Sequence, residues 1–250
     1  MYFPTTVHQR IRSHTVFIID KRTKEIGSGV LMCLEEKFFV LTAAHVIAGD
    51  VDVGLGLFHP QTPLTVQKKW ADRSLDIGYL ELKPFEVSIF LGNLNAPIKP
   101  RRQQTTMVPL MRTTIAISGF PVQRRHVRDD RQEFEVLFLT LAFLDPMKWP
   151  DAYKTTCNPD LSFLLPFGPK HGGDFHDKDG KIVPPIRPHG LSGAGVWYYD
   201  TETENSDNPV YSLLGIQHSY DEFYQVLIGT HISFLLNRIL SDYALKLPNI

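Results

Sequence analysis

Short apolar runs separated by polar turn signals make up most of the chain. The run Val-Phe-Ile-Ile at 16–19 is followed by a polar turn at 20–25 and by a second apolar run at 28–33. Further runs of this kind lie at 38–41, 64–66, 77–82, 114–118, 135–144, 196–199, 212–216 and 225–228. Such runs, rich in β-branched and aromatic residues and bounded by Gly, Pro and Asp, are typical of an all-β barrel or sandwich.

Two segments depart from this rhythm. Near the C-terminus, apolar residues recur at helical spacing, at Ile232, Leu235, Leu236, Ile239 and Leu240. This stripe predicts an amphipathic helix over 232–243. Residues 145–190 instead hold many prolines and few strand-like runs. Because this segment is too long for an ordinary connection in a compact domain, we expect it to be functional or mobile.

Composition and charge fit one compact unit and exclude several classes of partner. The chain has 250 residues, of which 43% are hydrophobic, so a substantial core is available. Its 26 Lys and Arg nearly balance its 27 Asp and Glu, so no strong field draws it to nucleic acid or to acidic lipid. No run approaches about 18 uninterrupted apolar residues, and we expect no transmembrane helix and no membrane partner.

The N-terminus and the cysteines predict a cytoplasmic protein. Residues 1–10 lack the apolar stretch of a secretory signal peptide. The chain has two cysteines, Cys33 and Cys157. Two cysteines without a signal peptide fit a reducing compartment better than an oxidising one, and we therefore expect both thiols to be free.

A histidine follows one of the apolar runs in a distinctive setting. Residues 41–46 read Leu-Thr-Ala-Ala-His-Val, so His45 stands at the end of a strand with two small alanines before it. The alanines leave room for the imidazole to reach a cleft, where it could act as a general base. A lone histidine in such a place is usually a core or capping residue, but the preceding Gly-Ser-Gly-Val at 27–30 favours the functional interpretation.

An aspartate begins the strand predicted at 77–82. The segment 74–82 reads Ser-Leu-Asp-Ile-Gly-Tyr-Leu-Glu-Leu, with Asp76 at the mouth of the strand. A carboxylate there would hydrogen-bond the inner nitrogen of His45 and fix its tautomer. An aspartate that only starts a strand is the ordinary alternative. Asp72 is the nearest competitor, but it lies before the strand rather than at its mouth.

A glycine-flanked serine supplies a nucleophile. Residues 189–197 read His-Gly-Leu-Ser-Gly-Ala-Gly-Val-Trp, with Ser192 between the glycines. Glycine permits the positive φ and the close backbone approach that a nucleophile beside oxyanion donors requires. A glycine-rich β-turn without chemistry is the alternative. A hydroxyl, an imidazole base and an orienting carboxylate are together the groups that serine-based acyl transfer needs.

In the order His, Asp, Ser, these three motifs resemble those of the trypsin-like serine peptidases of the chymotrypsin fold. The matched segments cover roughly 15–82 and 188–243. The resemblance implies that His45, Asp76 and Ser192 form a catalytic triad. It further implies a serine endopeptidase that cuts a protein or peptide substrate through an acyl-enzyme, with no cofactor and no metal.

The same resemblance sets expectations for the fold and for the oxyanion hole. It implies an all-β chain of two antiparallel six-stranded β-barrels followed by a C-terminal α-helix. The first barrel would cover 10–100 and carry the histidine and the aspartate, and the second would cover 101–250 and carry the serine. The N–H groups of Gly190 and Ser192 would form the oxyanion hole.

The specificity pocket is harder to read. By resemblance its base lies near Ile186, and its walls come from Gln217, His218, Ser219, Tyr220 and Leu227. A basic P1 residue would need an acidic base, which Ile186 does not supply. Gln217 and His218 could hydrogen-bond an acidic or amide side chain, and an apolar or small P1 residue is equally open.

Leu191 marks a departure from the digestive members of this family. Those enzymes carry an aspartate at this place, which pairs with a new N-terminus released by cleavage, and leucine cannot make that ion pair. In this respect the chain is closer to bacterial intracellular relatives.

Because a fold does not guarantee activity, two alternatives stay open: a catalytically latent peptide-binding or regulatory module, and an esterase. We also hypothesise that an activating partner protein or substrate orders residues 145–190.

Two other polar clusters are interpreted as solvated loops. Residues 171–180 hold two histidines and three aspartates, but their spacing matches neither a zinc hairpin nor a calcium loop. The basic run at 124–128 is more typical of a hairpin tip than of a nucleic-acid site. We therefore expect no metal site in either cluster.

Overall fold

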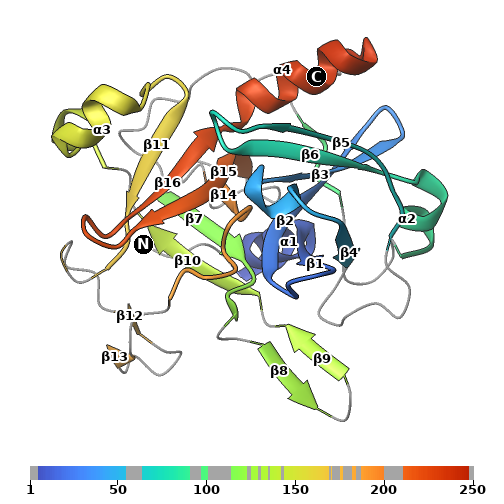
Figure 1. Cartoon of the computed structure of the whole chain (residues 1–250), viewed down its shortest axis with the longest axis horizontal. Coiled ribbons are helices and arrows are strands. Elements are labelled where there is room, and N and C mark those ends of the chain that lie inside the picture. Colours follow the sequence, from blue (N-terminus) through green and yellow to red (C-terminus); the bar gives the residue numbers. More distant parts are fainter. Residues whose placement is uncertain are drawn as a thin grey trace.

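A computed structural model of the chain is mostly β, with two six-stranded antiparallel sheets and a C-terminal helix (Figure 1). It describes residues 5–54, 64–90, 97–100, 114–122, 125–128, 131–134, 136–141, 144–168, 170, 175–176, 182–183, 187–199 and 211–247. In this part of the chain no helix is both long and apolar enough to cross a bilayer.

The first sheet is built from the N-terminal third of the chain. Its strands have the spatial order β4-β1-β2-β3-β6-β5. They are β1 (Thr15–Asp20), β2 (Ile26–Leu34), β3 (Lys37–Thr42), β4 (Val51–Gly54), β5 (Val66–Asp72) and β6 (Ile77–Leu82). An isolated antiparallel bridge joins Val53 on one edge strand to Leu64, just before the other edge strand. A cluster of buried aliphatic side chains that includes Val16, Leu31 and Leu80 forms the core of this sheet.

The second sheet is built from strands between residues 114 and 231. Its strands have the spatial order β10-β7-β14-β15-β16-β11. They are β7 (Thr114–Gly119), β10 (Leu137–Leu141), β11 (Ser162–Pro166), β14 (Gly195–Tyr199), β15 (Tyr211–Asp221) and β16 (Val226–His231). Just beyond one edge strand, the N–H of Leu144 donates to the carbonyl of Leu164 on the other, at 2.9 Å. In both sheets the edges therefore meet at one backbone contact, and full closure into barrels stays a prediction.

Helices and short hairpins complete the described residues. The helices are α1 (Thr5–His14), α2 (Pro84–Phe90), α3 (Asp151–Thr156) and α4 (Ile232–Tyr243), with short 3₁₀ turns η1 (His45–Ile47) and η5 (Pro146–Lys148). The hairpins are β8 (Arg125–Arg128) with β9 (Arg131–Phe134), and β12 (Phe175–His176) with β13 (Ile182–Val183). The basic run expected to be a hairpin tip is thus largely the strand β8 of a hairpin, and most of 171–180 lies outside the described residues.

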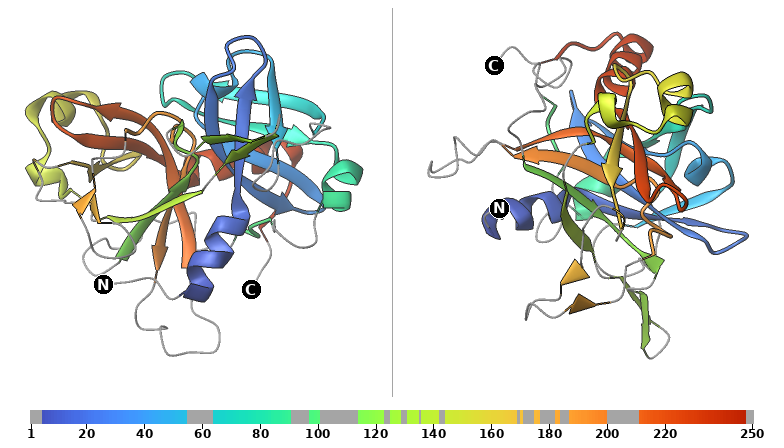
Figure 2. Two further views of the ribbon diagram at one scale, coloured as in Figure 1. Left: turned by 90° about the horizontal axis from the view of Figure 1, so that it is seen from below. Right: turned by 90° about the vertical axis from the view of Figure 1, so that its left-hand side faces the viewer.

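A shared core joins the two sheets. One buried cluster combines Val30 and Met32 of β2 with Trp197 of β14 and Ile216 of β15. Helices α1 and α4 each contribute apolar side chains to the same cluster. Figure 2 shows the two sheets side by side, with α1 lying along the boundary between them. The sheets are therefore packed against each other, which brings loops from both to one place.

The structure contains elements that the apolar pattern of the sequence did not predict, namely α1, most of β5, α3 and β11. Helix α4 and strand β6 have the predicted bounds. Helix α1 was not predicted, because its sequence has two apolar residues, Val7 and Ile11, which give too short a stripe. The run at 64–66 extends into β5, an edge strand with exposed lysines. The segment 145–190 is not one irregular insertion, since it contributes α3 and the sheet strand β11.

Candidate active site

His45 begins the short 3₁₀ turn that follows β3. Ala43 and Ala44 before it are buried, at 0% and 4% exposure, so the turn packs closely against the first sheet. The side chain of His45 itself is 51% exposed. The small alanines let the backbone pack closely while the imidazole stays at the surface, and the expected cleft beside the ring stays a prediction.

Asp76 closes the tight turn between β5 and β6. Its φ of +46° lies in the left-handed region, which residues other than glycine adopt at an energetic cost. The turn is held by Asp72, whose Oδ1 accepts hydrogen bonds from the N–H of Ser74 at 2.8 Å and of Leu75 at 3.1 Å. Asp72, the competing carboxylate, therefore caps the turn and leaves Asp76 to face His45.

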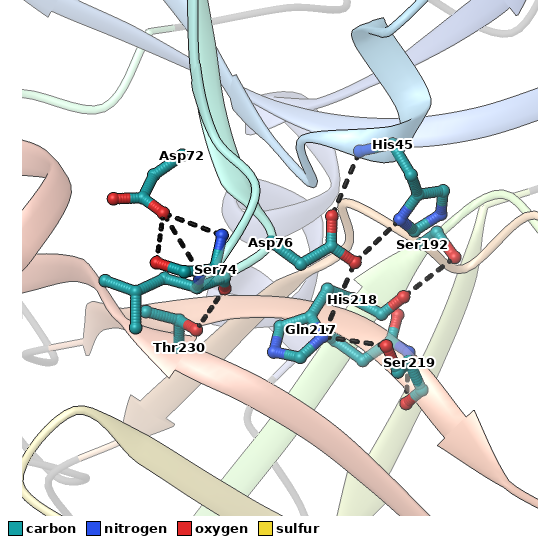
Figure 3. A network of polar contacts seen from close by, with 10 residues as sticks. His45, Asp72, Ser74, Asp76, Ser192, Gln217, His218, Ser219 and Thr230 are labelled. Carbon is teal, nitrogen blue, oxygen red and sulfur yellow. Dashed lines mark hydrogen bonds and ion pairs between the residues drawn. The ribbon is translucent and has the colours of Figure 1, made fainter. Parts of the chain in front are cut away.

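His45 and Asp76 form a doubly hydrogen-bonded pair (Figure 3). Nδ1 of His45 lies 2.8 Å from Oδ2 of Asp76, and the backbone N–H of His45 donates to Oδ1 at 3.0 Å. The hydrogen bond to Asp76 raises the pKa of His45 above its ordinary value. Burial alone would raise the pKa of Asp76, but the hydrogen bonds from His45 outweigh it and hold that pKa below its usual value. The aspartate is therefore ionised at neutral pH, which leaves Nε2 of the histidine for proton transfer.

Ser192 lies on the loop 188–194, immediately before β14. Two tight turns shape this loop: the N–H of Leu191 donates to Pro188 O at 2.9 Å, and that of Ala194 donates to Leu191 O at 2.7 Å. The side chain of Leu191 is fully buried in the core of the second sheet. The loop is also tied to the first sheet, because the N–H of Ser28 on β2 donates to Ser192 O at 2.7 Å.

The hydroxyl of Ser192 stands beside the ring of His45 (Figure 3). Its Oγ donates to the backbone carbonyl of His218 at 3.2 Å. Among the described residues no hydrogen bond joins this Oγ to His45. The serine and the histidine are therefore neighbours that no hydrogen bond joins in this structure, and hydrogen bonds of this kind are often long or misaligned in the absence of substrate.

Two glycines give the serine loop its shape. Gly190 has φ +89° and Gly193 has φ +88°, both in the region that favours glycine. A Cβ at Gly193 would overlap the carbonyl oxygen of Ser28 and the hydroxyl of Thr42, and one at Gly190 would overlap the carbonyl oxygen of Phe120. Neither position therefore accepts a side chain without a shift of backbone.

Two backbone N–H groups in this loop, those of Gly190 and Ser192, are not used in the hydrogen bonds among the described residues. The carbonyl of His189 accepts a hydrogen bond from the N–H of Val122 at 2.8 Å. Because a trans peptide places its C=O and N–H on opposite sides, the N–H of Gly190 points away from Val122. Such donors are the components of an oxyanion hole.

The residues expected to line the specificity pocket are only partly brought together. Gln217, His218 and Ser219 follow one another on β15 beside Ser192, and Nε2 of Gln217 donates to Ser219 O at 3.0 Å. Tyr220 instead packs edge-on against Phe167, and Leu227 is fully buried in the core of the second sheet. Ile186 lies outside the described residues. The composition of the pocket therefore stays a prediction.

His218 also contacts the candidate triad. Its Nδ1 lies 3.7 Å from Oδ2 of Asp76 and 2.9 Å from Oγ of Ser219. Burial lowers the pKa of His218 to about 4, although the neighbouring carboxylate of Asp76 opposes this. At neutral pH the ring is therefore uncharged. The carboxylate of Asp76 faces two imidazoles, one from each sheet.

Two further side chains at the site were missed by the sequence reasoning. Ser28 donates its hydroxyl to Gly190 O at 2.7 Å and accepts from the N–H of Phe120 at 2.8 Å. Thr230 on β16 donates its hydroxyl to Leu75 O at 2.8 Å. The glycines around Ser28 were the only signal for its role, and the sequence around Thr230 gave none.

Among the described residues, no group of three His, Cys, Asp or Glu side chains is arranged to bind a metal ion. Cys33 and Cys157 are both free thiols, as predicted.

No model of a known protein family matches this sequence, and no curated protein is significantly similar to it. Function must therefore be inferred from the chemistry and geometry of the site.

Proposed function

We propose that this protein is a serine endopeptidase that resembles the trypsin-like peptidases and uses Ser192, His45 and Asp76. The observation that carries the proposal is the 2.8 Å hydrogen bond between Nδ1 of His45 and Oδ2 of Asp76, with the hydroxyl of Ser192 beside the same ring. A partly buried carboxylate on the inner nitrogen fixes the tautomer in which the outer nitrogen is a base.

The proposed reaction proceeds through an acyl-enzyme. Oγ of Ser192 attacks the carbonyl carbon of the scissile peptide while Nε2 of His45 takes its proton. The N–H groups of Gly190 and Ser192 stabilise the negative oxygen of the tetrahedral intermediate. The C–N bond then breaks, and His45 gives the proton to the leaving amine. Water attacks the resulting ester with His45 as base, which releases the acid and returns the proton to Ser192.

The ion pair of Asp76 with protonated His45 stabilises the charged intermediate states. Because the pKa of Asp76 is held below its usual value, the carboxylate stays ionised throughout the cycle. Asp76 accepts no proton from the histidine and serves to orient and stabilise it. This role is consistent with the second hydrogen bond, from the backbone N–H of His45, which fixes the other carboxylate oxygen.

The wider architecture of the family is part of the same proposal. We expect each sheet to close into a six-stranded barrel, one within 10–100 and one within 101–250, with an extended peptide bound between them. Protein or peptide substrates, a cytoplasmic location and the absence of a cofactor are carried by the resemblance and by composition. The burial of Leu191 supports a loop that takes its shape by apolar packing, without an ion pair from a newly cut N-terminus.

Labelling with a fluorophosphonate probe tests the proposal. The wild-type chain is expected to react at one serine, to be identified by mass spectrometry as Ser192, and to cleave a peptide library. Ser192→Ala should lose both reactions and keep its thermal stability. Ser162→Ala on β11 is a matched control that should keep both. Labelling that persists in Ser192→Ala would refute the assignment of the nucleophile.

One observation favours a second candidate, a catalytically latent peptide-binding module. Oγ of Ser192 is bonded to the carbonyl of His218 rather than to His45. In a latent protein this bond would persist, peptides would bind, and neither probe nor peptide would react. A partner need not order the whole of 145–190, because 144–168 already form defined elements, including α3 and β11. The hypothesis of an activating partner then concerns the rest of that segment. Much of the remaining segment lies outside the described residues.

A further inference from the structure

The turn that carries Asp76 is held from both sheets. Within the first sheet, Asp72 caps the turn through three hydrogen bonds, two to backbone N–H groups and one to the hydroxyl of Ser74. From the second sheet, the hydroxyl of Thr230 donates to Leu75 O at 2.8 Å. Thr230 is 1% exposed, so no water replaces this bond easily. The contact therefore fixes the peptide that leads directly into Asp76.

The carboxylate itself is also approached from the second sheet. His218 is on β15, which pairs with β16, the strand of Thr230. Its Nδ1 faces Oδ2 of Asp76 at 3.7 Å, and that oxygen is the one bonded to His45. The hydrogen bond of Nδ1 joins it to the hydroxyl of Ser219 at 2.9 Å, so its approach to the carboxylate is a longer polar contact and not a hydrogen bond. The side chain of His218 is only 12% exposed, which keeps the ring in this place.

Asp76 needs such support because its backbone is strained. Its φ of +46° is a conformation that a non-glycine residue keeps only when its surroundings determine it. If the peptide between Leu75 and Asp76 were free to turn, the residue would relax toward negative φ. The carboxylate would then leave the line to Nδ1 of His45. Contacts that hold Leu75 O and Oδ2 of Asp76 oppose this relaxation.

We infer that Thr230 and His218 are positioning residues that hold Asp76 in line with His45, so that the second sheet orients a residue of the first. The inference rests on the proposed function, in which Asp76 acts through His45. Neither side chain touches the reacting atoms. Loss of either should lower kcat, which depends on the orientation of His45, and loss of Thr230 should leave KM nearly unchanged.

Thr230→Val tests the first contact, because valine has the shape of threonine but no hydroxyl. The expected result is a fall in kcat of about 10- to 100-fold, the size of effect that a displacement of roughly 1 Å produces, with KM within about twofold. The matched control is Thr65→Val in the first sheet, which removes a hydroxyl that bonds Oε1 of Glu86 at 3.0 Å, away from the site. The control should keep the wild-type kcat.

A pair of variants of equal size tests the second contact. In His218→Asn the amide nitrogen can occupy the place of Nδ1 and keep a polar group beside Asp76, whereas His218→Leu has a similar size and no polar group. We expect the leucine variant to lose about 10-fold in kcat and the asparagine variant to recover most of it. A merely structural role would give the two variants equal activity, and that outcome would overturn the inference for His218.

A readout that does not need activity separates this inference from the proposed function. The hydrogen bond to Asp76 raises the pKa of His45. NMR titration of the His45 ring measures this pKa in the wild-type protein and in Thr230→Val. A fall of that pKa by at least about 0.5 unit in Thr230→Val supports the positioning role even if no peptide is cleaved. An unchanged pKa overturns it. If the wild-type enzyme is labelled at Ser192 while Thr230→Val and His218→Leu keep full kcat, the inference fails and the proposed function stands.

Discussion

The turn that carries Asp76 and the loop that carries Ser192 face each other across the candidate site, but different forces hold them. The turn 72–76 is polar and is fixed by hydrogen bonds that Asp72 accepts and by one that Thr230 donates. The loop 188–194 is fixed by a fully buried Leu191 and by glycines that permit positive φ. The first is sensitive to the loss of a donor or acceptor, and the second is sensitive to the loss of volume or to an added Cβ.

The difference teaches what each residue needs for its proposed role. An orienting carboxylate acts through the direction of a hydrogen bond, and polar neighbours determine direction well. A nucleophile beside an oxyanion hole needs backbone N–H groups that stay unpaired, so the loop cannot be held through those groups. Burial of Leu191 holds the loop from behind and leaves both donors unused. The variants below test this contrast, in order of decreasing expected effect.

Asp76→Asn should have the largest effect. Asparagine tolerates positive φ and has the same size, so the turn should persist while the negative charge is lost. We expect kcat to fall by about 10⁴-fold, equivalent to about 5 kcal/mol in the barrier. The hydrogen bond to Asp76 raises the pKa of His45 in the wild type. As the pH is lowered, kcat/KM of the variant should therefore begin to fall at a lower pH than kcat/KM of the wild type. A variant with more than a tenth of wild-type activity would contradict the role of Asp76.

Leu191→Ala should show that the serine loop depends on apolar packing. Removing the buried side chain should cost about 3 kcal/mol in the free energy of unfolding, measured by urea denaturation. The matched control is Leu165→Ala on β11, a fully buried leucine of the same cluster. Both should lose similar stability, but only Leu191→Ala should also lower kcat. Equal kcat in the two variants would mean that the loop holds its shape without Leu191.

Acid should weaken the strands that support the Asp76 turn. His218 on β15 and His231 on β16 are buried, and burial lowers the pKa of each to about 4. An unfolded histidine titrates near pH 6.5, so their contribution to stability is complete above that pH and is lost as pH falls toward 4. At pH 5 each of these two histidines should lower the free energy of unfolding by about 2 kcal/mol relative to neutral pH. The pKa of His45 is raised, so its protonation acts in the opposite sense and stabilises the folded state.

Urea denaturation at pH 7 and pH 5 measures this loss. His218→Asn removes one of the two buried titrating rings, so its stability should fall less between these pH values than that of the wild type. An equal loss in the two proteins would show that His218 is protonated in the folded state at pH 5.

Asp72→Ala should have the smallest effect on stability and still be informative. It removes the cap of the Asp76 turn and should cost about 1 kcal/mol in the free energy of unfolding, with a several-fold fall in kcat. Asp20→Ala is the matched control, since Asp20 caps the β1–β2 turn in the same way, with Oδ1 accepting from the N–H of Arg22 and of Thr23. The control should keep wild-type kcat. Lower kcat in both variants would indicate a general loss of structure.

The sequence predicted elements whose residues pack on one face or fill the interior. Strand β6 is buried at every position and helix α4 has a regular apolar stripe, and both were located to the residue. Strand β5 is an edge strand with exposed lysines, so only its first residue was recognised. Strand β11 was hidden because prolines and glycines surround it. An element that gains its stability from neighbours distant in sequence leaves a weak local pattern.

The site was predictable as far as its chemistry is written in local motifs. His45, Asp76 and Ser192 were chosen from short segments, and the structure brings these segments together. The neighbours of Asp76 were not predictable in the same way. Thr230 reaches Leu75 across 155 positions of sequence, and a threonine near the end of a strand has no distinctive pattern. His218 was expected to line a pocket, and its approach to Asp76 depends on the irregular register of β15 near Gln217.

The shared core between the sheets has a consequence for the timing of activity during folding. The base and its aspartate lie before residue 83, whereas the nucleophile and the strands that support Asp76 come after residue 187. A nascent chain that has completed only its first sheet holds an imidazole and a carboxylate without a nucleophile. Under the proposed function, a complete triad would form only when the late strands dock. In a refolding experiment, recovery of probe labelling should lag behind recovery of β-structure.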